Sequence, residues 1–91
     1  MDTKILNYRV IIEKEKQKGG IVYVAYAPTL GISDFGKSIE IAVENIEKAI
    51  KFYLDTLIEL KKAIPAPDTE DYFITTRKIE LTYPAKKLAY C

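Results

Sequence analysis

The stretch from Ser38 to Lys62, SIEIAVENIEKAIKFYLDTLIELKK, decides the fold. Its apolar residues recur at spacings of three and four, which is the period of an amphipathic α-helix with one apolar stripe. Ser38 is a typical N-cap, and Glu40 lies in the first turn, where a carboxylate favours the helix dipole. Pro65 and Pro67 follow the last turn and prevent its continuation. The stripe predicts one long helix, with Ile39, Ala42, Val43, Ile46, Ala49, Ile50, Tyr53, Leu54, Leu57 and Ile58 on its buried face.

Working outward toward the N-terminus, three shorter segments have the features of β-strands. Residues 5–15 alternate between apolar and polar side chains, which predicts a half-buried strand. Gly19 and Gly20 supply a hairpin connection, so residues 21–27, apolar on both faces, are predicted to return as an antiparallel interior strand that ends at Pro28. Residues 32–35 predict a third, brief strand.

On the other side of the helix, residues 72–82 are rich in aromatic and β-branched side chains and predict a final strand. The expected fold is therefore α+β in the order βββαβ: a small, mostly antiparallel sheet with one long helix packed on one face. Which face of residues 21–27 points away from the helix stays open, because Val22, Val24 and Tyr26 alternate with Ile21, Tyr23 and Ala25. Either set would leave an apolar patch in water, so self-association into a dimer or tetramer is expected.

Composition sets bounds on the function. A chain of 91 residues is expected to form a single domain over residues 1–91, and a net charge of +1 provides no overall attraction to nucleic acid. There is no apolar segment long enough for a membrane span and no secretory signal, which favours a cytoplasmic location. The lone Cys91 has no partner for a disulfide and is the last residue, where a frayed thiol is the simplest interpretation.

The same composition argues against catalysis. Histidine is absent, which removes the commonest general base and the commonest transition-metal ligand. The acidic residues do not form a recognisable metal motif, and the glycines lack the spacing of a phosphate-binding loop. We therefore expect no catalytic residues, no metal site and no cofactor, and we interpret the chain as a binding module.

Several blocks of sequence carry a resemblance to a known family. Residues 8–14, YRVIIEK, and residues 20–31, GIVYVAYAPTLG, look like the opening of HicB-like antitoxin domains. Residues 35–42, FGKSIEIA, and 45–53, NIEKAIKFY, are similar to the glycine turn and helix of that family, and residues 64–67, IPAP, resemble its proline exit. The likeness covers roughly residues 8–81.

The resemblance implies a partial ribonuclease-H-like fold, homo-oligomerisation, and binding to a small HicA-type toxin that cleaves messenger RNA and whose active site the antitoxin occludes. The chain departs from the family at Leu30-Gly31-Ile32, where relatives carry a proline-containing turn, and residues 83–91 are too short for an appended DNA-binding module. Direct DNA binding is therefore not expected. The alternative is an orphan RNA-binding or ligand-sensing domain of the same fold.

Partner-binding residues are expected around the end of the interior strand and the loop that follows it. Tyrosine offers rigid, amphipathic contact area, and a carboxylate near it would complement a cationic RNA-cleaving surface. A basic stretch, Arg77 to Lys87, could instead touch RNA, although lysines there are also typical of a protected sheet edge. The predicted partner-binding residues are Tyr23, Tyr26, Pro28, Leu30, Asp34 and Phe35.

Overall fold

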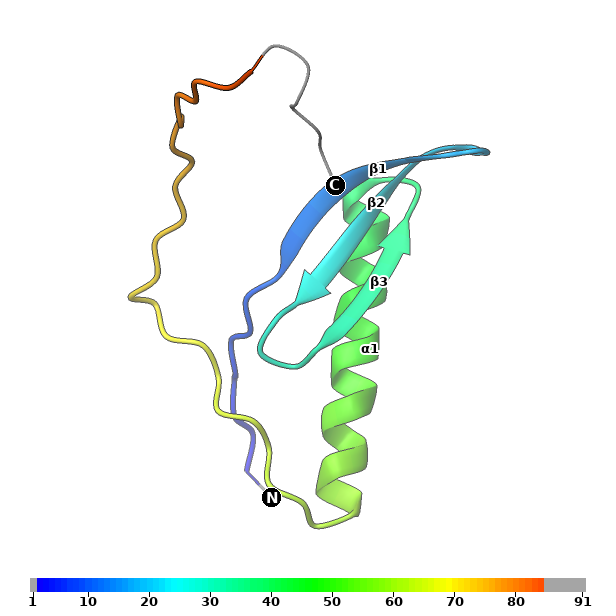
Figure 1. Ribbon diagram of the computed structural model, residues 1–91. Helices are drawn as coiled ribbons and strands as arrows, with labels where there is room; N and C mark the ends of the chain where they lie inside the picture. The colour runs from blue at the N-terminus through cyan, green and yellow to red at the C-terminus, as the bar shows by residue number, and fades with distance from the viewer. Residues whose placement is uncertain (1, 85–91) are drawn as a thin grey trace.

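The computed structural model describes residues 2–84, and its regular elements occupy the middle of the chain (Figure 1). Strands β1 (Ile11–Gln17), β2 (Gly20–Ala27) and β3 (Ile32–Gly36) form an antiparallel sheet in the order β1-β2-β3. Helix α1 (Ile39–Glu59) then crosses one face of this sheet. The α+β class and the βββα arrangement predicted from the sequence are confirmed.

The first hairpin sets the register of the sheet. Gln17 pairs with Gly20, and a positive φ of 124° at Gly20 is a conformation that glycine adopts without a Cβ clash. At the other end, Ile11 pairs with Tyr26 and β2 stops one residue later, before Pro28. Residues 5–10, predicted as the start of the first strand, therefore have no strand neighbour, and β1 begins at Ile11 instead.

The core lies where α1 meets β2 and β3. Ala25, Ala27 and Ala42 are fully buried, and their small side chains let the helix lie close to the sheet. Gly36 makes the approach closest, because a Cβ at this position would lie 2.6 Å from the backbone nitrogen of Ala42. Ile46 is the largest fully buried side chain and fills the centre of the contact.

The helix begins as predicted and ends earlier than predicted. The Ser38 hydroxyl accepts a hydrogen bond from the Ile41 N–H at 3.1 Å, which confirms the N-cap. At the other end Lys61 has a φ of 56°, and the Lys61 and Lys62 amides donate back to carbonyls of the last turn at 3.0 and 2.9 Å. This Schellman arrangement ends α1 at Glu59, three residues before the predicted end at residue 62.

Only the first half of the helical stripe is covered by the sheet. Ala42 and Ile46 are buried and Ile50 packs against them, whereas Ile58 is 59% exposed. Figure 1 shows why: α1 runs well past the ends of the strands. The periodicity of the stripe therefore gives the helix correctly and overstates how much of it this sheet covers.

The final strand predicted over residues 72–82 is wrong, since the chain from 60 to 84 contains no helix or strand. After the helix, the chain returns beside the N-terminal segment, and the Asp68 N–H donates to the Asn7 carbonyl at 2.8 Å, as the first bond of a parallel ladder would. The Asp68 carboxylate then accepts the Arg9 N–H at 2.6 Å, so that donor is not free for a backbone carbonyl of the returning chain. The ladder stops after its first bond.

Candidate protein-binding face

The structure decides which face of the sheet is left uncovered by the helix. Side chains alternate along a strand, and Tyr23, Ala25 and Ala27 of β2 belong to the core contact with α1. Their neighbours Val22 and Val24 therefore point the opposite way, together with their cross-strand partners. We call this surface the outer sheet face: it consists of Ile11, Glu13, Glu15, Val22, Val24, Tyr26, Ser33 and Phe35.

Charge is segregated between the two faces of the hairpin. The sequence of β1 alternates glutamate and lysine, so Glu13 and Glu15 lie on the outer sheet face while Lys14 and Lys16 lie on the opposite one. Glu13 pairs across the sheet with Val24, and Glu15 with Val22. The outer sheet face is thus apolar along β2, acidic along β1, and free of lysine and arginine.

Two shallow hollows lie on this face and share Val24 as a common wall. One, of about 400 Å³, lies over β1 and β2 and is lined by Ile11, Glu13, Glu15, Val24 and Tyr26. The other, of about 390 Å³, lies toward β3 and is lined by Gln17, Val24, Ser33, Asp34 and Phe35. Tyr26 is 43% exposed and Phe35 62% exposed, so each hollow has a large aromatic side chain available for contact.

The six predicted partner-binding residues are divided between three environments. Tyr26, Phe35 and Asp34 gather around the two hollows of the outer sheet face, and exposed Pro28 lies in the turn between β2 and β3. Tyr23 and Leu30 pack against the core instead. Of the two tyrosines left open by the sequence, Tyr26 is therefore the outward one.

Asp34 has a local structural role beside the outer sheet face. Its carboxylate accepts the N–H of Phe35 at 2.8 Å, and the Asn45 side-chain amide donates to the Phe35 carbonyl, also at 2.8 Å. Both backbone polar groups of Phe35 are thus satisfied by side chains. No sequence pattern places Asn45 at the site, whereas Glu13 and Glu15 could have been found from the strand alternation once the hairpin register was known.

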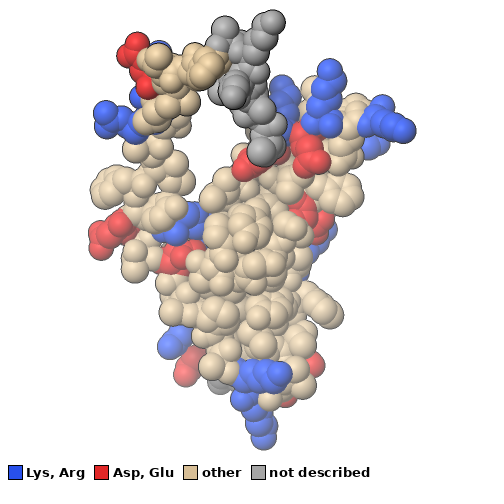
Figure 2. All heavy atoms as spheres, in the orientation of Figure 1, with Lys and Arg blue, Asp and Glu red and all other residues tan. Residues whose placement is uncertain are grey.

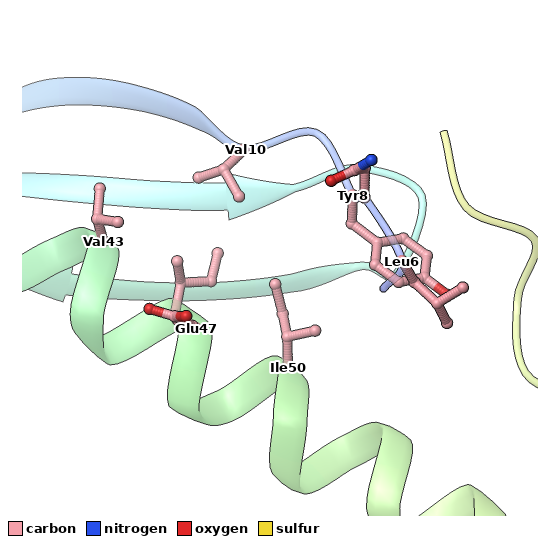
Figure 3. Close-up of a pocket in the computed structure, with 8 residues that line it drawn as sticks. Leu6, Tyr8, Val10, Val43, Glu47 and Ile50 are labelled. Atoms are coloured by element: carbon pink, nitrogen blue, oxygen red, sulfur yellow. The ribbon is translucent and has the colours of Figure 1, made fainter. Parts of the chain in front are cut away.

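A second, different surface lies between the N-terminal segment and α1. Figure 3 shows Leu6, Tyr8 and Val10 on one side of this groove and helical residues on the other, and its volume is about 360 Å³. It continues toward the end of α1 as a hollow of about 450 Å³ that reaches Ile58. The Tyr8 hydroxyl donates to the Pro65 carbonyl at 2.6 Å, and burial, with the nearby Asp68 charge, raises the pKa of this phenol.

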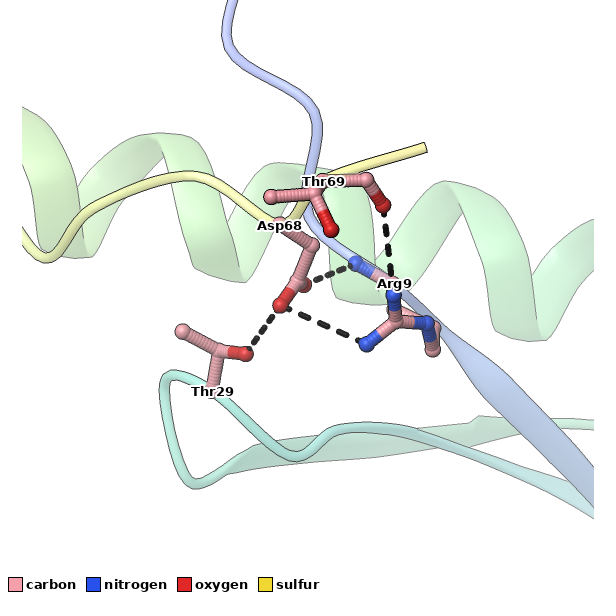
Figure 4. A network of polar contacts seen from close by, with 4 residues as sticks. All are labelled: Arg9, Thr29, Asp68 and Thr69. Atoms are coloured by element: carbon pink, nitrogen blue, oxygen red, sulfur yellow. Dashed lines mark hydrogen bonds and ion pairs between the residues drawn. The ribbon is translucent and has the colours of Figure 1, made fainter. Parts of the chain in front are cut away.

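A polar network connects the N-terminal segment, the turn between β2 and β3 and the segment that follows α1 (Figure 4). The Asp68 carboxylate accepts the Arg9 N–H and the Thr29 hydroxyl, each at 2.6 Å, and lies 3.4 Å from the Arg9 guanidinium. The Arg9 backbone bond, then the Thr29 bond, and the guanidinium charge hold the pKa of this carboxyl below its ordinary value, although burial opposes them. No sequence signal predicts this network, because 59 residues separate Arg9 from Asp68.

The lowered pKa of Asp68 predicts that the stability of the fold depends on pH. A carboxyl whose pKa is lower in the folded state stabilises the fold above its unfolded pKa of about 3.9 and loses that contribution as the pH falls through the folded value. Asp68→Asn should therefore lower the urea midpoint at neutral pH, and the gap from the parent protein should close on acidification. Denaturation series at several pH values measure this gap.

Asp55→Asn is the matched control. Asp55 also pairs with a cation, Lys51 at 3.1 Å, but the pair is on the exposed face of α1. Exposed pairs of this kind contribute about 0–1 kcal/mol, so this variant should change the midpoint little at any pH. A gap between Asp68→Asn and the parent that is the same at acidic and neutral pH would contradict the assignment.

Two further findings concern the described residues 2–84. They contain no cluster of three or more His, Cys, Asp or Glu side chains arranged to hold a metal ion. Within the same range, no helix combines the length and the apolar character that crossing a bilayer requires.

Comparison with known proteins identifies a relative of similar size. The chain is 38% identical over 66 residues to the UPF0150 protein ssr1765 of Synechocystis sp. (strain ATCC 27184 / PCC 6803 / Kazusa), and the match covers 71% of this chain and 80% of that protein. No family model matches the sequence, and no solved structure matches it. The identity and the coverage together show that the chain belongs to the UPF0150 family.

Proposed function

We propose that this chain is a HicB-like antitoxin, or a protein-binding module derived from one, that binds a small, basic HicA-type toxin through the outer sheet face. The observation that carries the proposal is the combination of exposed Tyr26 and Phe35 with Glu13 and Glu15 on one side of the sheet. Protein interfaces favour aromatic side chains at their centre and charge complementarity at their rim. The similarity of several sequence blocks to HicB-like domains supplies the class of partner.

The charge of this face favours a protein partner over RNA. Glu13 and Glu15 would repel phosphates brought close to Val24 and Tyr26, whereas they would attract the basic surface of a protein that itself cleaves RNA. Binding there would place the apolar part of the face against the toxin and keep its substrate away. The chain would act by occlusion and would need no catalytic group of its own.

The test is co-expression with a HicA-type protein encoded beside this chain. Induction of that protein alone is expected to arrest growth, and co-induction of this chain should restore growth and give a complex that survives size-exclusion chromatography. A variant with Tyr26→Ala and Phe35→Ala should fail to restore growth while staying folded, because both side chains are exposed and their removal leaves no cavity.

Failure of the parent chain both to restore growth and to form a complex would reject the proposal. Measurement of RNA binding by the purified chain then separates the alternative. Contacts to phosphates through residues such as Arg77 and Lys78 would weaken steeply as salt is raised, whereas an apolar protein interface would be little affected.

A further inference from the structure

The segment after the first ladder bond, residues 69–84, is here called the arm. Every residue of the arm is exposed, including large apolar side chains: Phe73 is 93% exposed and Ile79 is 75% exposed. The radius of gyration of the molecule is 18.1 Å, compared with about 12 Å for a compact domain of this length. Figures 1 and 2 show the reason, since the arm stands away from the sheet with open space between them. A strand-like apolar segment is left without a partner.

Contacts at its base turn the arm away from its own sheet. The Asp68 carboxylate accepts the Arg9 N–H in the segment that leads into β1. The Arg9 side chain reaches outward, where its guanidinium donates to the Thr69 carbonyl at 3.4 Å and lies 3.1 Å from the centre of the Tyr72 ring. Laying the arm along its own β1 would require these contacts to break.

The two edges of the sheet differ in what they offer to another strand. At β3, the N–H and C=O of Phe35 are already bonded to the side chains of Asp34 and Asn45. At β1, no strand within residues 2–84 pairs with the edge opposite to β2. Unpaired edge groups are a template for strand addition, and β1, with seven residues against the five of β3, offers the longer edge.

We propose that the arm of one copy adds as a strand to the free β1 edge of a second copy, and that the exchange is reciprocal. Two chains related by a twofold axis offer two arms and two open edges, so each arm finds a partner and the assembly closes as a dimer. Reach is sufficient, because an extended segment of 16 residues (69 to 84) spans about 50 Å while the seven residues of β1 span about 23 Å.

The first measurement is the mass of the full chain in solution. Light scattering should give about twice the chain mass of 10.4 kDa. Replacing two adjacent arm residues by proline, Ile74→Pro with Thr75→Pro, removes two consecutive N–H groups, one of which must face the edge in either register. This variant should be monomeric with an unchanged circular dichroism signal from α1. The control is Asp2→Pro with Thr3→Pro, at two exposed residues outside every element, which should stay dimeric.

The second measurement identifies the contact and the copy that supplies it. Phe73 is replaced by the photoreactive p-benzoylphenylalanine in a mixture of ¹⁴N- and ¹⁵N-labelled chains that have been allowed to exchange subunits. After irradiation, mass spectrometry should find the peptide containing residue 73 joined to the peptide containing β1, in pairs with one heavy and one light member. The same photoreactive residue at Phe52, which is 75% exposed on α1, should give no link to β1.

The proposal is overturned if the full chain is a monomer, if the links to β1 occur only within chains of one label, or if residue 73 links to α1 instead of β1. Links within one label would mean that the arm closes on its own sheet. The proline variant changes no residue of the outer sheet face, and Tyr26→Ala and Phe35→Ala change no residue of the arm, so loss of the dimer and loss of toxin binding are tested by different variants.

Discussion

Replacing Ile46 with alanine is expected to lower the free energy of unfolding by about 2–5 kcal/mol, a large part of the stability of so small a domain. Ile46 is 1% exposed and is the largest side chain buried between α1 and the sheet. Three of the residues that form the core are alanines, which contribute little apolar area, so the deleted methylene and methyl groups have few substitutes. Urea denaturation followed by circular dichroism measures the change.

Ile58→Ala is the matched control on the same helix. Ile58 belongs to the same apolar stripe but is 59% exposed, so its truncation should change the free energy of unfolding by no more than about 0.5 kcal/mol. The two variants remove the same atoms from the same apolar stripe. They differ in that the sheet covers Ile46 and leaves Ile58 exposed. A loss below about 1 kcal/mol for Ile46→Ala, or equal losses at the two positions, would show that the sheet does not cover the first half of α1.

This contrast also shows how much of the fold the sequence could predict. A helix and a hairpin depend on residues that are close together in the sequence. The spacing of Ile46 and its neighbours therefore predicts α1, and the paired glycines predict the turn from β1 to β2. How far the sheet extends over the helix depends on the residue at which the pairing between neighbouring strands ends. Pro28 ends β2 and thereby fixes the start of β1, which is a non-local consequence of a local signal.

The prediction of a fourth strand over residues 72–82 was wrong for a reason that local sequence patterns do not contain. Residues 72–82 have strand composition, but a strand exists only beside another strand. In the structure, Arg9 donates its N–H to the side chain of a residue 59 positions away and not to a backbone carbonyl. The residues of the candidate binding face were likewise only partly predictable from the sequence. Alternation predicted two possible faces, and only the packing of Tyr23 against α1 assigned Tyr26 to the outer one.

The second large effect is expected at the proposed interface with a HicA-type toxin. In protein complexes a few aromatic anchors carry most of the binding energy, and truncating one costs at least about 2 kcal/mol, or about 30-fold in Kd. Tyr26 and Phe35 are the exposed aromatic side chains of the outer sheet face, one beside each hollow. Tyr26→Ala and Phe35→Ala should each weaken the complex by about this factor, and the loss should appear as faster dissociation.

The acidic charge of the outer sheet face should affect the association rate. Glu13→Gln with Glu15→Gln keeps the shape of the face and removes its acidic charge, so association with a basic toxin should slow, with the larger effect at low salt. Asp34 is a poorer choice for this purpose than its position in the sequence indicates, because its carboxylate holds the Phe35 N–H and its loss would disturb the edge of β3. Surface plasmon resonance separates the two rates for each variant.

Tyr53→Ala is the control for the aromatic variants, since Tyr53 is a comparable 36% exposed but belongs to α1, away from the outer sheet face. It should leave both rates unchanged. If Tyr53→Ala weakens the complex as much as Tyr26→Ala does, the toxin binds the helix side of the molecule. If the glutamine pair changes dissociation and leaves association intact, Glu13 and Glu15 lie inside the contact as direct hydrogen-bond acceptors, because long-range attraction alters the encounter while buried contacts govern the lifetime of the complex.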